Sequence, residues 1–158
     1  MSQLHQSYLD LLAELSGSLD RLSQLARDKA AAIQADDLIA LDEVLKQEQA
    51  MTLNLRGLEL RRLKLVGQLG LDHVPLSGLE DHCPPELAPR ARSVSETLRE
   101  SYAAYRSCAD MARTLLELNL HQLEKVITAA GVDPAVAAAG YEPPGVEPPK
   151  KMKTDFRA

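Results

Sequence analysis

The side chains best suited to chemistry gather in one short stretch, where His73, His82 and Cys83 lie close together in the sequence. Imidazole and thiolate are the groups that zinc prefers as ligands, so the stretch invites comparison with zinc sites. The spacing matches no zinc pattern, and no histidine has a glutamate three positions before it, as a di-iron helical bundle requires. The sequence also lacks a glycine-rich phosphate loop and a nucleophile motif. We therefore expect no catalytic residue, no metal site and no cofactor, and we do not expect an enzyme.

The composition excludes several other classes of function. The net charge is −5, and aromatic residues make up 3% of the chain. Negative charge repels phosphate backbones, which argues against nucleic-acid binding, and scarce aromatic residues argue against a small-molecule pocket. Without an apolar run of membrane-spanning length or a secretion signal, we expect no membrane insertion. The two cysteines form no disulfide framework, so we expect a cytoplasmic protein.

One segment does carry a strong pattern, and the pattern is apolar rather than catalytic. Between residues 115 and 127 the apolar positions cover about 200° of a helical wheel, more than packing in a small bundle usually needs. Either the helix is inserted here between two helices of its own chain, or the surplus apolar surface receives the amphipathic helix of a partner. On the second interpretation the partner-binding residues are Leu115, Leu116, Leu120, Leu123 and Ile127.

This segment belongs to a long predicted helix that spans about residues 86–130. Apolar residues recur there at steps of three and four, with Pro84, Pro85 and Pro89 near the start and Gly131 at the end. At 1.5 Å per residue such a helix is about 68 Å long, and it is stable in water only if its apolar side is covered.

Two earlier helices are predicted to provide that cover. Leucines at steps of three and four predict a first helix over about residues 4–35. A turn at residues 35–37, with an aspartate as the cap, leads into an antiparallel second helix over residues 38–69 that ends at Gly70. A continuous helix through residues 35–37 is the alternative. We place Leu38 and Leu45 in the main apolar stripe of the second helix, and we interpret Leu53, Leu60 and Leu63 as its contact with a second neighbour.

The remaining segments complete the predicted fold. Residues 71–85 read as a crossover with a short turn of helix near residues 76–82, whose leucines close one end of the bundle. Residues 132–158 are rich in proline and poor in apolar mass, which predicts a mobile tail. The fold class is therefore all-α: residues 1–131 form an elongated antiparallel bundle of three long helices, a helical hairpin plus one very long third helix, followed by a flexible C-terminal tail.

The order of these elements resembles the FlgN family of flagellar type III export chaperones over about residues 4–130. The leucine stripe of the first helix, the acidic turn, the leucine-containing connection and the asparagine among leucines late in the long helix follow the family pattern. The matching residues are Asp37, Leu38, Leu41, Lys46, Gln47, Leu58, Glu59, Arg61 and Arg62 in the second helix and Leu115, Leu116, Asn119 and Leu120 in the third.

The resemblance implies a cytoplasmic, non-enzymatic chaperone for the hook-associated proteins FlgK and FlgL. Such chaperones hold the C-terminal amphipathic helices of these proteins, prevent their premature assembly and deliver them to the export apparatus, where the gate protein FlhA is the docking point. The resemblance also implies that neither nucleotide nor metal is needed, and for such a chaperone we expect a monomer or a weak homodimer.

Two questions stay open at the level of sequence. The tail is either an inert solvated end or a short linear motif in which Tyr141 and Phe156, near Lys150, Lys151 and Lys153, dock on the export gate. A different class of function is a homo-oligomeric helical scaffold or adaptor, in which identical chains bury the apolar surplus of residues 115–127 between them. The mass in solution, with and without client, distinguishes the scaffold from the chaperone.

Overall fold

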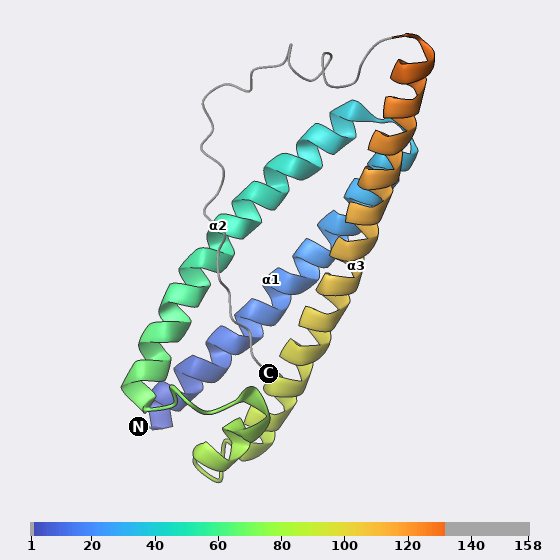
Figure 1. Ribbon diagram of the computed structural model, residues 1–158. Helices are drawn as coiled ribbons and strands as arrows, with labels where there is room; N and C mark the ends of the chain where they lie inside the picture. The colour runs from blue at the N-terminus through green and yellow to red at the C-terminus, as the bar shows by residue number, and fades with distance from the viewer. Residues whose placement is uncertain (1, 132–158) are drawn as a thin grey trace.

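The computed structural model describes residues 2–131, which form three long α-helices and one short 3₁₀-helix. The elements are α1 (Ser2–Gln34), α2 (Leu38–Leu69), η1 (Leu76–His82) and α3 (Ala88–Ala129). Figure 1 shows α1 between α2 and α3, with α1 and α3 running in the same direction and α2 in the opposite one. The all-α class is confirmed for residues 2–131, in which no strand occurs, whereas the predicted mobile tail falls on residues 132–158, outside this range.

The helix boundaries follow from local chemistry. Asp36 adopts a left-handed conformation with φ of 52°, so the chain turns there and the alternative of a continuous helix is wrong. The side chain of Asp37 accepts a hydrogen bond of 3.0 Å from the backbone N–H of Ala40 and so caps α2. At the other end Gly70 has φ of 67°, and the N–H of Leu71 donates to the carbonyl oxygen of Val66 at 3.0 Å. This left-handed glycine and the bond that spans it satisfy carbonyl groups that the helix end leaves open.

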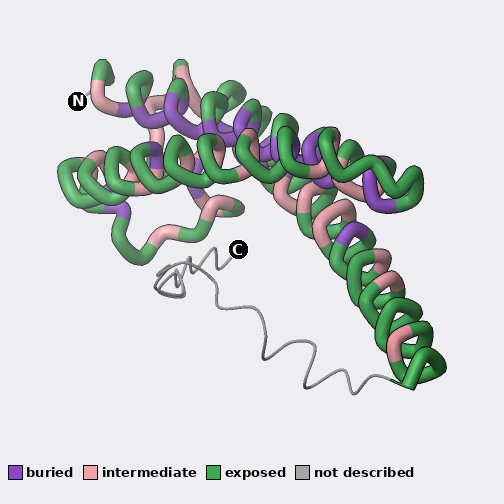
Figure 2. Tube along the Cα trace, turned by 90° about the horizontal axis from the view of Figure 1, so that it is seen from above, coloured by how far each residue is buried: buried purple, intermediate pink, exposed green. Residues whose placement is uncertain are grey.

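Helix α1 is the element that both other helices cover. The largest fully buried side chains among residues 2–131 are Leu9, Leu11, Leu12, Leu15 and Leu25, and all of them belong to α1. Figure 2 shows this concentration of buried positions along α1. The connection closes one end of this core, as predicted, because Leu71 and Leu79 are buried there against the same cluster. Since full burial of a leucine contributes about 1.5–3 kcal/mol, the leucines of α1 supply much of the free energy that holds the helices together.

Helix α2 departs from the prediction. It packs along α1, but within residues 2–131 no Cα atom of α2 lies within 8 Å of one in α3. The interpretation of Leu53, Leu60 and Leu63 as a contact with a second neighbour is therefore wrong, because all three side chains are exposed. The placement of Leu38 and Leu45 in the buried stripe is wrong as well. The physical reason is that α1 offers two apolar sides, so α2 and α3 each pack on α1 rather than on each other.

Candidate partner-binding surface

Helix α3 is longer than the hairpin on which it packs. The side-chain amide of Asn119 donates a hydrogen bond of 3.5 Å to the carbonyl oxygen of Ile33, in the last turn of α1. Residues 120–129 of α3 therefore continue for about 15 Å past this level. Figures 1 and 2 show this end of α3 extending away from the hairpin.

The end of α3 carries a row of apolar side chains that we call the leucine ridge, which begins beside the hairpin and continues along the projecting part: Leu116, Leu120, Leu123 and Ile127. At about 100° per residue these four positions lie within about 60° of one another around the helix. Leu116, Leu120 and Leu123 are 42%, 52% and 55% exposed, and Ile127 is half-buried. The structure thus brings together four of the five residues that the sequence singled out. It also excludes the alternative in which these leucines are enclosed between two helices of the same chain.

The fifth residue and two further ones point elsewhere. Leu115 is half-buried and lies about 110° from the centre of the ridge. Leu118 and Val126 are exposed apolar side chains that the sequence-based selection left out, and Leu118 lies about 170° from the ridge centre. Exposed polar residues lie about 130° or more from the ridge centre, on the other side of the helix: His121, Gln122 and Lys125. The end of α3 is therefore an amphipathic segment whose apolar side its own chain leaves largely uncovered.

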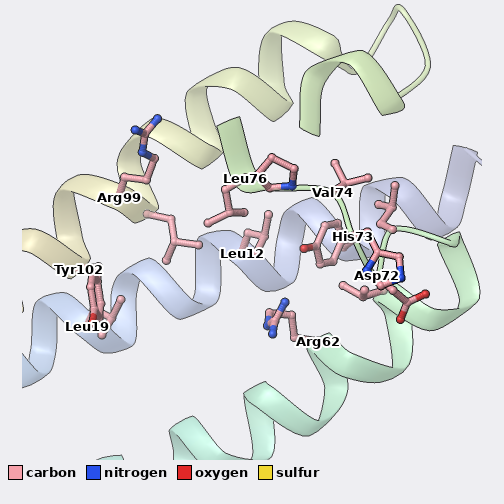
Figure 3. A pocket seen from close by; sticks show the side chains of 14 residues that line it. Leu12, Leu19, Arg62, Asp72, His73, Val74, Leu76, Arg99 and Tyr102 are labelled. Carbon is pink, nitrogen blue, oxygen red and sulfur yellow. The ribbon is translucent and has the colours of Figure 1, made fainter. Parts of the chain in front are cut away.

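A cavity of about 430 Å³ lies near the other end of the molecule, lined by α1, α2, α3 and the connection between α2 and α3 (Figure 3). Apolar side chains from four segments form its walls, among them Leu12 and Leu19 of α1, Val66 of α2, Val74 and Leu76 of the connection and Leu98 of α3. Arg62 and Arg99 stand at its edge, from α2 and α3 respectively. No spacing in the sequence pointed to this cavity.

Two polar groups that line this cavity, the guanidinium of Arg62 and the hydroxyl of Tyr8, have pKa values above their usual range. Arg62 makes two hydrogen bonds to the carboxylate of Glu59, of 2.8 and 2.7 Å, and this pairing raises the pKa of the guanidinium above its usual value. Burial raises the pKa of the Tyr8 hydroxyl, so the phenol stays neutral at physiological pH. Neither group has the lowered pKa of an activated nucleophile or the near-neutral pKa of a general base.

Of the three residues that raised the question of metal binding, His73 is exposed, Cys83 packs against the core cluster, and His82 makes polar contacts within the fold. The Nδ1 of His82 lies 2.9 Å from the carbonyl oxygen of Gly78, and the Nε2 of His5 lies 3.2 Å from the carbonyl oxygen of His82. Burial raises the pKa of the Cys83 thiol, which keeps it in its unreactive protonated form near neutral pH. Within residues 2–131 no group of three or more His, Cys, Asp or Glu side chains is arranged to hold a metal ion.

The suggested gate-docking residues, Tyr141 and Phe156, lie outside the described part of the chain. None of the helices within residues 2–131 combines the length and apolarity needed to cross a membrane.

Comparison with known proteins places the chain in a family. Searches of curated proteins and of solved structures found no match. A family model described as FlgN protein, however, matches residues 1–149, nearly the whole sequence. The chain therefore belongs to the FlgN family, as its sequence resemblance predicted, and so to a family of flagellar export chaperones rather than of enzymes.

Proposed function

We propose that this protein is a cytoplasmic type III export chaperone that binds the C-terminal amphipathic helices of the hook-associated proteins FlgK and FlgL. In this role it prevents their premature assembly and delivers them to the export apparatus, where FlhA is the docking point. Family membership supports the class of function. The observation that supports the binding mode is the leucine ridge, three of whose four residues lie on the part of α3 that projects past the hairpin.

The ridge has the properties of one half of a helix–helix interface. An amphipathic helix binds by placing its apolar side chains against such a row. Leu116, Leu120 and Leu123 are each about half-exposed, so covering the remaining surface contributes about 1 kcal/mol per leucine. A client helix that covers the ridge also removes an apolar surface that would otherwise favour aggregation.

The test is a double substitution in the full chain, Leu120→Asp with Leu123→Asp. Two lost leucine contacts amount to about 2 kcal/mol, so we expect the affinity for the C-terminal segments of FlgK and FlgL to fall at least about 30-fold in isothermal titration calorimetry. The matched control is Leu118→Asp, which changes an equally exposed leucine on the opposite side of the same helix. Its affinity should equal that of the unmodified chain.

Two results would contradict the proposal. The first is an unchanged affinity of the double variant while circular dichroism shows its helices intact. The second is an equal loss of affinity in the Leu118→Asp control, because the effect would then not belong to the ridge. If instead the ridge joins identical chains into a scaffold, the double variant lowers the mass of a stable oligomer in the absence of client.

A further inference from the structure

The outward side of α2 is an apolar surface that the leucine ridge does not include. Leu38, Leu45, Leu53 and Leu60 are 76%, 42%, 65% and 69% exposed. The buried residues of α2 are Val44, Leu58 and Val66, and the exposed leucines centre about 140° away from them around the helix. Figure 1 shows α2 at one edge of the molecule, with α1 on its other side. This surface therefore faces away from the rest of the chain.

The residues on this surface are arranged symmetrically about Gln49. Six positions lie four, seven or eleven residues before or after Gln49. All six, together with Gln49, fall within an arc of about 80° around the helix. In one direction they are Leu45, Asp42 and Leu38, and in the other they are Leu53, Arg56 and Leu60. Each leucine is thus mirrored by a leucine, and the acidic residue is mirrored by a basic one. All seven residues are exposed.

We propose that this surface is the interface of an antiparallel homodimer, in which α2 packs against α2 of a second copy of the chain around a twofold axis at Gln49. A twofold interface brings the same surface together from both copies, so each contact occurs twice. Leu38 then meets Leu60 of the second copy, Leu45 meets its Leu53, and Asp42 meets its Arg56. The two Gln49 amides meet at the axis, where each can donate and accept a hydrogen bond.

Charge complementarity is what identifies the occupant as a second copy in the antiparallel direction. A parallel pair in the same register would place Asp42 against Asp42 and Arg56 against Arg56, and both contacts are repulsive. Asp42 already pairs with Lys46 at 2.9 Å, but both side chains are about two-thirds exposed. Arg56 also has an interaction within its own chain. Because Asp42 and Arg56 are both exposed, such contacts contribute little and can be exchanged for the pair across the interface. An unrelated partner helix would not require a pattern that is symmetric within this chain.

This inference does not rest on the proposed function. The dimer surface belongs to α2, on the side turned away from α1, whereas the leucine ridge belongs to residues 116–127 of α3. A dimer formed through α2 leaves one ridge free on each copy.

The main test is the mass of the full chain in sedimentation equilibrium. As concentration rises, the unmodified protein should move from 17.3 kDa towards twice that value. Arg56→Asp and Asp42→Arg each create two like-charge contacts, so each variant alone should stay at the monomer mass over the same range. An equimolar mixture of the two variants pairs aspartate with arginine at both contacts and should recover the dimer. Both substitutions lie at exposed positions, and circular dichroism checks that the fold is retained.

Disulfide trapping tests the register and direction. In a chain with Cys83→Ser and Cys108→Ala, Gln49→Cys should link two copies readily under oxidised glutathione, because the two sulfur atoms meet at the axis. The matched control is Gly67→Cys, on the same side of α2 with open space for a side chain. In the antiparallel dimer the two control cysteines lie about 54 Å apart along the helices, so they should not link.

Each other outcome overturns the proposal. A monomer mass for the unmodified chain at all concentrations removes the dimer. A dimer that survives both single charge variants, or variants that fail to pair when mixed, places the interface elsewhere or gives it to a different partner. Equal linking by Gly67→Cys and Gln49→Cys indicates parallel pairing.

Discussion

Gly67 and Gly70, near the end of α2, have different backbone requirements although they are only three residues apart. Gly67 is helical, and an added Cβ atom would meet nothing within 4 Å, whereas Gly70 has φ of 67°. Gly67→Ala should therefore raise the free energy of unfolding by about 0.5–1 kcal/mol, because alanine favours the helix. Gly70→Ala should lower it by about 1–2 kcal/mol, because a side chain is strained in the left-handed region. Urea unfolding of both variants checks the pair, and a shift of the same sign in both would contradict this account of the helix end.

Local residues determined what could be predicted about the helix boundaries, and non-local packing determined what could not. Asp37 and Gly70 were predictable as the ends of α2 because capping depends on groups within one turn. The neighbours Val44 and Leu45 both fit an apolar stripe, but only Val44 is buried. That choice depends on the angle at which α1 meets α2, which no spacing within α2 records. The cavity beside Arg62 and Arg99 was missed for the same reason, since its walls come from four separate segments.

At the scale of one element, α3 is predicted to be stable along most of its length and weakly held at its end. Beyond Asn119 it has no neighbouring helix among the described residues, and helices that lack tertiary packing open readily. In the free protein the backbone amides of residues 120–129 should exchange with deuterium much faster than those of residues 95–112, as mass spectrometry of peptide fragments would measure.

Client binding should slow deuterium exchange at the end of α3 and not at its start. If the helix of FlgK or FlgL covers the leucine ridge, exchange in residues 116–129 slows, whereas exchange in the first turns of α3 stays the same. Protection confined to residues 62–76 and 98–102 would instead place the client in the cavity between α2 and α3.

At the scale of the whole molecule, the position of α1 makes the three helices depend on one another. Leu15 is fully buried in the cluster that joins α1 to both α2 and α3. Leu15→Ala should lower the free energy of unfolding by about 2–5 kcal/mol, because it removes buried contacts and leaves a cavity. Since α2 and α3 each pack on α1, labels placed on these two helices should report the same shifted denaturation midpoint. Leu118→Ala, at an exposed site, should change the stability by less than about 0.5 kcal/mol. Separate midpoints for the two labels would show that α2 and α3 unfold independently.

If the tail is the gate-docking motif, client binding and gate docking belong to different parts of the chain, and we expect them to be separable. Residues 132–158 carry Tyr141 and Phe156 near three lysines, and the leucine ridge lies entirely before them. A chain that ends at Gly131 should therefore bind the C-terminal segments of FlgK and FlgL with unchanged affinity and lose binding to FlhA, both measured by titration calorimetry.

In the full chain, Tyr141→Ser with Phe156→Ser should reproduce this loss of FlhA binding, because an aromatic anchor contributes most of the energy of a short docking motif. Lys150→Gln with Lys151→Gln serves as the control for charge alone, and its binding should weaken mainly at low salt. If the shortened chain binds FlhA as tightly as the full one, the docking surface lies within residues 1–131 and the aromatic residues of the tail have no part in it.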